Sequence, residues 1–362
     1  MSKPVIVSGI QPTGNLHIGN YLGAVKNWLE LQKSGKYELY IFIADLHSLT
    51  GKLTAEQLRE QVKITAAELL AAGIDPDKTT FFVQSQVVGH TDLAWIFNCV
   101  TPIAELYRMT QFKDKSGAAQ TFKEIESELE NIQRDGREYL SPVVAKNTLD
   151  FFKTINRSSV GLFDYPVLQA ADILIYKGEL VPVGQDQVQH VELTRDIARW
   201  FNNRYGEFFS PVQHKLTTVP KVMSLLEPEK KMSKSLGAGH VVELRETPEE
   251  IENKLKKAVT ATSGGGQAPG VANLLGLLKE FGEKKVYDAF VVAEKDGSIR
   301  YGDLKKSLGE AIAKHFEDFR AGREKLLKDP KKLDKILAKG AAKAQKVADK
   351  NMTEVRKLVG IR

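Results

Sequence analysis

The sequence is short of cysteine and of long apolar runs, and each absence removes a class of protein. Cys99 is the only cysteine among 362 residues. One cysteine per chain excludes an internal disulfide, a four-thiolate zinc site and a cysteine-ligated iron–sulfur cluster. No apolar run reaches the roughly 18 residues of a membrane span, and the segment from Met1 to Val7 turns polar too soon for a signal peptide. We therefore expect a protein of the reducing cytoplasm that does not enter a membrane.

Before the last 40 residues, the chain also lacks an excess of positive over negative charge. The net charge is +6, and the last 40 residues hold 13 Lys and Arg against 5 Asp and Glu, so the rest of the chain is close to neutral. A basic end predicts a polyanionic partner, because phosphate contacts from lysine and arginine give affinity that does not depend on sequence. The alternative is a solvated lysine-rich helix with no partner.

Apolar segments with strand character alternate with helical patterns through the first 200 residues. Strands are expected at residues 4–8, 38–44, 79–83 and 178–183, and helices at 54–72, 91–97 and 186–203. This alternation predicts an α/β fold with a parallel sheet. Parallel sheets bind ligands at the carboxyl ends of their strands, so the loops at 9–19, 44–50 and 84–90 should border one site.

Two segments do not follow this alternation. Residues 116–159 are rich in charge and show helical spacing, which predicts a helical insertion. From Thr247-Pro248-Glu249-Glu250, a typical helix start, helical patterns continue to the end of the chain. We expect an α/β domain at residues 1–236 and an all-helical domain at 237–362.

The first glycine-rich turn carries a histidine where a helix begins. It reads Gly9-Ile10-Gln11-Pro12-Thr13-Gly14-Asn15-Leu16-His17-Ile18-Gly19-Asn20 and matches neither a Walker loop nor the G-x-G-x-x-G fingerprint. A helix start attracts anions, His17 adds a donor for a phosphate, and Gly19 leaves room for a planar base. A single histidine in such a turn is more often only a satisfied polar residue.

A second motif, rich in lysine, lies at the predicted domain boundary. Lys230-Lys231-Met232-Ser233-Lys234-Ser235 places Lys231 and Lys234 three residues apart, so both can reach one side of a loop. Mobile cations suit a reaction in which negative charge peaks in the transition state. Taken alone, this stretch also fits a solvated linker.

Together, His17-Ile18-Gly19-Asn20 and Lys231-Met232-Ser233-Lys234-Ser235 resemble the two signature motifs of class I aminoacyl-tRNA synthetases. Three further stretches resemble the tryptophanyl-tRNA synthetase branch: residues 9–14 (GIQPTG), 163–174 (FDYPVLQAADIL) and 181–187 (VPVGQDQ). The resemblance implies a Rossmann-like nucleotide-binding domain followed by a helical domain that reaches the tRNA anticodon. It covers nearly the whole chain.

The resemblance implies that ATP activates L-tryptophan to tryptophanyl-adenylate, which then esterifies the 3′ end of tRNA(Trp). Because the attacking carboxylate is already ionised near neutral pH, the first step needs alignment and charge neutralisation rather than a general base. Mg²⁺ is expected to enter with ATP, without dedicated protein ligands. The resemblance also implies a homodimer in which each tRNA spans both subunits.

The resemblance further assigns roles to individual residues. His17, Lys231 and Lys234 would be the catalytic residues. The ATP site would be formed by the first turn, the segment after the fourth strand, one apolar residue at the adenine and the lysine loop: Gln11, Pro12, Thr13, Gly19, Asn20, Gly184, Gln185, Asp186, Val222, Lys231, Met232, Ser233, Lys234 and Ser235.

Asp172 is the residue expected to recognise the amino acid. Indole has one polar atom, an N–H donor, and a buried carboxylate that accepts from it rejects phenylalanine. The alternative is that Asp172 only caps or solvates its helix. The same pocket is expected to include the residues His47, Gln169, Val181 and Val183.

Gln169 keeps a rival reading open. Tyr-Pro-x-Leu-Gln-Ala-x-Asp resembles the tyrosyl-tRNA synthetases, whereas methionine is expected at position 169 in the tryptophanyl branch. The Gln11-Pro12-Thr13 loop and the 181–187 segment favour tryptophan. Two further alternatives are a regulatory nucleotide-binding protein and another nucleotidyltransferase with the same histidine motif. Pyrophosphate exchange that depends on a single amino acid would separate these readings.

Overall fold

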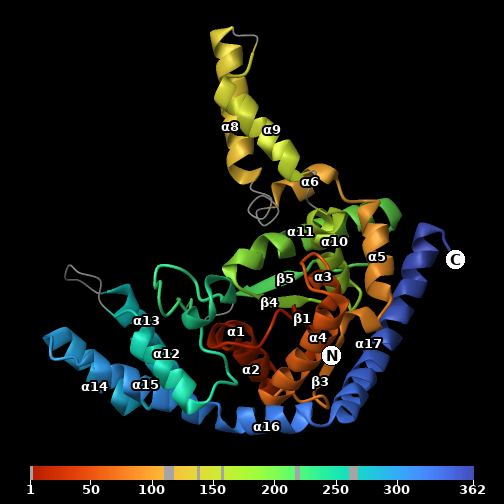
Figure 1. Ribbon diagram of the computed structural model, residues 1–362. Helices are drawn as coiled ribbons and strands as arrows, with labels where there is room; N and C mark the ends of the chain where they lie inside the picture. The colour runs from red at the N-terminus through yellow and green to blue at the C-terminus, as the bar shows by residue number, and fades with distance from the viewer. Residues whose placement is uncertain (1–2, 110–117, 137–138, 156–158, 217–220, 261–267) are drawn as a thin grey trace.

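The computed structural model describes residues 3–109, 118–136, 139–155, 159–216, 221–260 and 268–362 (Figure 1). Its centre is a sheet of five parallel strands in the order β3-β2-β1-β4-β5. The strands are β1 Val5–Ile10, β2 Glu38–Ile43, β3 Thr79–Val83, β4 Leu180–Val183 and β5 Gln213–Leu216. The predicted α/β fold with a parallel sheet is confirmed.

Alternate residues of the strands pack on opposite faces of the sheet, as the two-residue period of a strand requires. On β2, Ile41 and Ile43 belong to one apolar cluster, whereas Tyr40 and Phe42 belong to another. The helices that contribute side chains to the first cluster include α2 Lys26–Ser34 and α4 Ala55–Ala71. Those that contribute to the second include α5 Gly89–Asn98, α6 Ile103–Arg108, α10 Val160–Leu174 and α11 Val188–Tyr205.

The predicted insertion forms two helices that project from the body of the molecule (Figure 1). They are α8 Ala118–Asp135 and α9 Pro142–Ile155, and they pack against each other. Most of the described residues of this charged, periodic segment are therefore helical.

The described residues from Pro248 onward are mostly helical, as predicted. Its helices are α12 Pro248–Lys257, α13 Pro269–Phe281, α14 Lys284–Asp296, α15 Tyr301–His315, α16 Glu317–Leu327 and α17 Pro330–Val359. Helix α12 begins at the predicted point, where Thr247 accepts from the backbone N–H of Glu250 and the side chain of Glu250 accepts from the N–H of Thr247. This reciprocal capping explains why the helix starts there.

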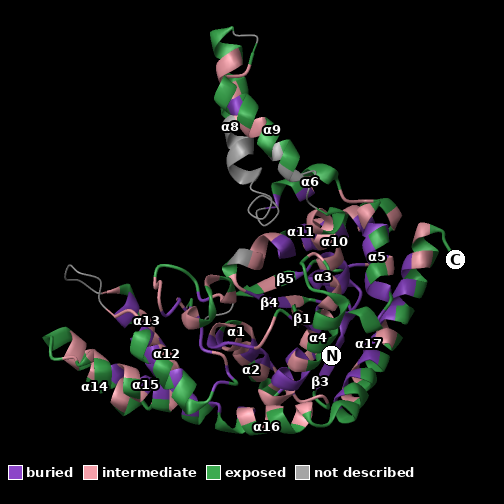
Figure 2. Ribbon diagram, in the orientation of Figure 1, coloured by how far each residue is buried: buried purple, intermediate pink, exposed green. Residues whose placement is uncertain are grey.

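Helix α17 returns to the sheet and covers the edge strand β3 (Figures 1 and 2). At the crossing, a Cβ added to Gly340 would lie 1.8 Å from the carbonyl oxygen of Phe81. Only glycine permits such an approach of two backbones. Covering β3 also protects an otherwise open sheet edge.

The sequence located four of the five strands but not β5. That strand reads Gln-His-Lys-Leu and is exposed or half-buried, so it lacks the apolar pattern by which strands are recognised. Helix α11 begins at Val188 rather than Asp186, because a 3₁₀ turn, Gln185–Gln187, precedes it. No helix among the described residues has the length and apolar character to cross a membrane.

Candidate functional site

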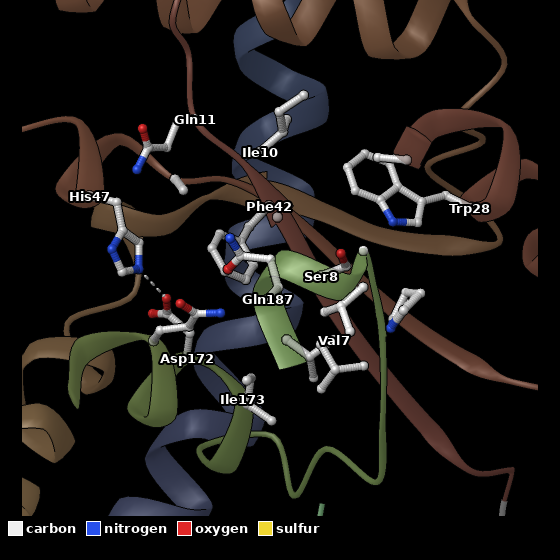
Figure 3. A pocket seen from close by; sticks show the side chains of 18 of the residues that line it. Val7, Ser8, Ile10, Gln11, Trp28, Phe42, His47, Asp172, Ile173 and Gln187 are labelled. Atoms are coloured by element: carbon white, nitrogen blue, oxygen red, sulfur yellow. Dashed lines mark hydrogen bonds and ion pairs between the residues drawn. The ribbon is translucent and has the colours of Figure 1, made fainter. Parts of the chain in front are cut away.

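A cavity of about 420 Å³ opens at the carboxyl ends of β1 and β4 (Figure 3). Its volume lies in the range of small-molecule sites. The end of β1 lines one wall, and Asp172 and His47 carry its buried polar groups. Predicted residues at this cavity are Gln11, His47, Gln169, Asp172, Val181, Val183 and Gly184. The structure thus brings the predicted amino-acid pocket together with part of the predicted ATP site.

Asp172 is 1% exposed and lies among three hydrogen-bonding side chains. Its Oδ2 atom is 2.7 Å from Nε2 of His47, while Oδ1 accepts from Nε2 of Gln84 at 2.7 Å and lies 2.6 Å from Nδ1 of His90. Nε2 of His90 lies in turn 2.7 Å from the hydroxyl of Tyr176. Asp172 is therefore the acceptor at the centre of a buried network, not a helix cap.

This network keeps Asp172 ionised. Burial alone would raise the pKa of its carboxyl group, but the charge and hydrogen bond of His47, together with those of His90, hold the pKa below its ordinary value. A carboxylate has about four acceptor positions, and three are used here. These three bonds leave one acceptor position free on Asp172, which is one of the residues that line the cavity.

The histidine turn lies at the start of α1 Ile18–Asn20, which continues through a π-helical turn, Tyr21–Val25, into α2. Nδ1 of His17 accepts from the N–H of Gly19 at 3.1 Å, and Oδ1 of Asn20 accepts from the N–H of His17 at 3.2 Å. A Cβ at Gly19 would lie 2.9 Å from the His17 ring. Gly19 thus makes room for the histidine itself, and the side chain of Asn20 supports the turn.

His17 is neutral at physiological pH. Burial and the charges of Lys234 and Lys231 lower its pKa to about 4. Because Nδ1 accepts from a backbone N–H, the proton of the neutral ring is on Nε2, and it can donate from there to an oxygen of a ligand.

The lysine loop lies against the first glycine turn. Nζ of Lys234 donates to the carbonyl oxygen of Thr13 at 3.4 Å, and a Cβ on Gly14 would lie 2.9 Å from that nitrogen. Met232 anchors the loop: it is 3% exposed, and its N–H donates to the carbonyl of Val222 at 2.9 Å. Two motifs about 210 residues apart in sequence therefore meet.

The remaining residues predicted for the ATP site differ in how far they are buried. Pro12 is buried, whereas Lys231, Ser235 and Gln185 are exposed, and Ser233 caps the short turn Lys234–Leu236. Val222 is 6% exposed and belongs to the apolar core. The backbone of Asp186 lies in the turn before α11, but its side chain is outside the described part of the structure.

Sequence reasoning placed the loop at 84–90 beside the site but missed the residues that matter there. Gln84 and His90 contact the site through Asp172 rather than by lining the cavity. The sequence signal that could have identified Gln84 and His90 is that both follow the carboxyl end of a predicted strand, β3. Tyr165, Trp28 and Phe42 also line the cavity, and aromatic residues in helices and strands carry no sequence signal that separates a lining residue from a core residue.

Comparisons with known proteins find relatives along nearly the whole chain. A family model described as tRNA synthetases class I (W and Y) matches residues 1–132 and 141–317. The chain is 40% identical to Tryptophan--tRNA ligase 2 of Streptomyces avermitilis, over 99% of this chain and 97% of that protein. The crystal structure of tryptophanyl-tRNA synthetase from Campylobacter jejuni complexed with ADP and tryptophane matches with a TM-score of 0.78 and 30% identity, over 99% of this chain and 100% of that one. The crystal structure of the Mycoplasma pneumoniae tryptophanyl-tRNA synthetase matches with a TM-score of 0.78 and 29% identity, over 100% of this chain and 99% of that one.

Proposed function

The chain belongs to the class I tRNA synthetases for tryptophan and tyrosine and is a tryptophan–tRNA ligase, and from this premise we propose how its residues divide the reaction. The enzyme activates L-tryptophan with ATP and transfers the tryptophanyl group to tRNA(Trp). The observation that carries the proposal is that Lys234 lies against the first glycine turn, whose residues Gly9, Ile10 and Gln11 also line the cavity that contains the buried carboxylate of Asp172.

Asp172 selects the amino acid. Its remaining acceptor position takes the indole N–H, and the bonds from His47, Gln84 and His90 fix the carboxylate in place. Phenylalanine would leave this acceptor without a donor in a buried site. Val181 and Val183 supply apolar wall, and the stem of Gln169 packs beside the ring.

The first turn and the lysine loop hold ATP. Gln11, Pro12, Thr13, Gly19 and Asn20 border the nucleotide, Gly184, Gln185 and Asp186 hold the ribose, and Val222 borders the adenine. Neutral His17 donates from Nε2 to a phosphate oxygen. Lys231 and Lys234, with the loop residues Met232, Ser233 and Ser235, take the pyrophosphate as it leaves. Because the tryptophan carboxylate attacks the α-phosphate as an anion, these residues align the reactants and offset the growing charge.

Mg²⁺ enters with the ATP phosphates. Within the described ranges, no group of three or more His, Cys, Asp and Glu side chains is placed to hold a metal ion. We propose that the enzyme works in the cytoplasm as a homodimer that binds tRNA(Trp) across both subunits. Val88, the residue directly before α5, and Trp95 on that helix are 62% and 71% exposed, and such exposed apolar side chains support a contact of this kind.

Pyrophosphate exchange with the variant Lys234→Ala tests the proposed division of roles. A lysine that acts mainly once charge has developed should lower kcat strongly and leave tryptophan affinity nearly unchanged. Lys33→Ala, a change at an exposed lysine on α2, is the control and should keep wild-type kinetics. Equal losses in kcat and in tryptophan binding would refute the role of Lys234.

A further inference from the structure

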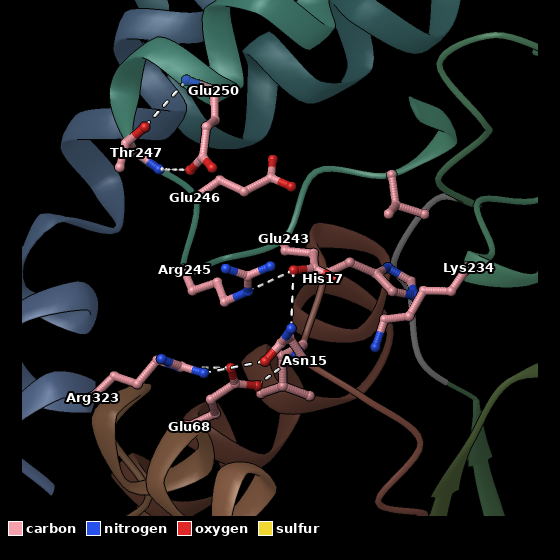
Figure 4. A network of polar contacts seen from close by, with 12 residues as sticks. Asn15, His17, Glu68, Lys234, Glu243, Arg245, Glu246, Thr247, Glu250 and Arg323 are labelled. Atoms are coloured by element: carbon pink, nitrogen blue, oxygen red, sulfur yellow. Dashed lines mark hydrogen bonds and ion pairs between the residues drawn. The ribbon is translucent and has the colours of Figure 1, made fainter. Parts of the chain in front are cut away.

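The histidine turn is tied to two distant helices by a polar network outside the cavity (Figure 4). The N–H of Leu16, directly before His17, donates to Oε2 of Glu68 on α4 at 2.6 Å. Nε of Arg323 on α16 donates to Oε1 of the same carboxylate at 2.8 Å, and its Nη2 donates to Oδ1 of Asn15 at 3.1 Å. One guanidinium therefore holds both a carboxylate and an amide that fix the backbone before His17.

The network continues into the segment that follows the lysine loop. Nδ2 of Asn15 donates to Oε2 of Glu243 at 3.1 Å, and Nε of Arg245 donates to the same oxygen at 2.7 Å. The backbones pair as well, because Leu244 donates its N–H to the carbonyl of Leu16 at 2.9 Å. The turn and the segment after the lysine loop are thus held as one unit.

Glu68 cannot exchange its partners for water, because it is 0% exposed. Burial raises the pKa of its carboxyl group, and the hydrogen bonds from Leu16 and Arg323 oppose that rise. Removing the guanidinium would leave a buried carboxylate without its counter-charge, which is costly. The position of α16 is therefore coupled to the position of the turn.

We propose that Glu68 and Arg323 are positioning residues, which hold the Asn15–His17 backbone where His17 can reach the ATP phosphates. The proposal rests on the proposed function of His17. Because Arg323 lies on α16, a helix of the C-terminal region would then help to support the nucleotide site. Neither residue lines the cavity at the ends of β1 and β4.

Steady-state pyrophosphate exchange with Arg323→Met tests the proposal, with ATP and tryptophan varied separately. We expect kcat/KM for ATP to fall at least tenfold while the KM for tryptophan stays within about twofold. Arg323→Lys keeps a cation beside Glu68 but has one donor nitrogen where the guanidinium has several. It should recover most of the lost kcat/KM for ATP. Should Arg323→Met not fold, the double variant Glu68→Gln with Arg323→Met removes the unpaired charge and should show the same ATP-specific defect.

Lys26→Met is the matched control. Lys26 on α2 pairs with Glu280 on α13 at 2.7 Å, so it too joins the sheet domain to a C-terminal helix, but this ion pair includes neither Asn15, Leu16 nor His17. It should keep wild-type ATP kinetics. If Arg323→Met changes thermal stability alone, or lowers the parameters for both substrates equally, the positioning role is overturned.

His17→Ala, measured in parallel, separates this inference from the proposed function. A defect in His17→Ala with normal ATP kinetics in Arg323→Met overturns only the positioning role. Normal ATP kinetics in His17→Ala would overturn the role of His17 itself, and the positioning role with it.

Discussion

At the scale of single residues, Asp172 makes the sharpest prediction. Asp172→Ala removes the carboxylate that accepts from the indole N–H, whereas an asparagine would keep an acceptor oxygen there. A hydrogen bond to a buried charged group contributes about 1.5 to 3 kcal/mol, so the ratio of kcat/KM for tryptophan over phenylalanine should fall by roughly 10- to 150-fold. Pyrophosphate exchange with both amino acids measures this ratio. A ratio within twofold of wild type would show that Asp172 serves only the buried network.

His17 should make the fold less stable in acid. Its pKa is about 4 in the folded protein, below the ordinary 6.5, so the unfolded chain binds more protons between these values. The neutral histidine therefore costs stability as pH falls from 6.5 towards 4, by about 2 kcal/mol at pH 5. Denaturant unfolding at pH 7 and pH 5 should show a smaller acid loss for His17→Asn than for wild type. Equal losses in the two proteins would contradict the assigned pKa.

At the scale of elements, the crossing of α17 over β3 depends on Gly340. Gly340→Ala would place a methyl group against the carbonyl of Phe81, and backbone cannot move aside as a side chain can. We expect a loss of about 2 kcal/mol or more in the free energy of unfolding. Gly276→Ala, in the interior of α13 with open space at the Cβ position, is the matched control and should be neutral or stabilising by up to about 1 kcal/mol. Similar effects at both glycines would argue against the close crossing.

The basic face of α17 should contribute to tRNA binding. Lys343 and Lys346 are exposed, while the buried face of the helix packs on the sheet domain. Lys343→Glu with Lys346→Glu should weaken aminoacylation and flatten its salt dependence, because phosphate contacts are lost. Pyrophosphate exchange should stay nearly intact. The pair Lys33→Glu with Lys36→Glu controls for net charge, because Lys33 in the last turn of α2 and Lys36 just beyond that helix are exposed lysines with the same sequence spacing. Equal effects of the two pairs would remove α17 from the tRNA surface.

The elements that the sequence predicted well are those with a buried, periodic face. Strand β3 matches its prediction at residues 79–83, and α4 begins one residue after the capping Thr54. Strand β5 could not be predicted, because its residues are polar and its pairing with β4 comes from tertiary contacts. The position of α17 also could not be predicted, because periodicity identifies the apolar face of a helix but not the surface against which that face packs.

At the scale of the whole molecule, the resemblance of two motifs to the signature motifs of one family predicted which distant segments meet. The His17 turn and the Lys234 loop converge, as the two motifs together implied. The sequence could not predict the polar network that holds these two segments in place. Glu68 and Arg323 are 255 residues apart, and each reads in sequence as one more charged residue on an amphipathic helix. Only the folded arrangement distinguishes a buried pair from a solvated one.

The central claim is that this enzyme activates tryptophan, and Gln169 makes tyrosine the rival that matters. ATP–pyrophosphate exchange by the wild-type protein, run with each standard amino acid in turn, tests the claim directly. We predict exchange that depends on tryptophan, with kcat/KM for tyrosine lower by at least about 100-fold, or roughly 2.7 kcal/mol. Faster exchange with tyrosine than with tryptophan would contradict the account and make Gln169 the residue that defines the pocket.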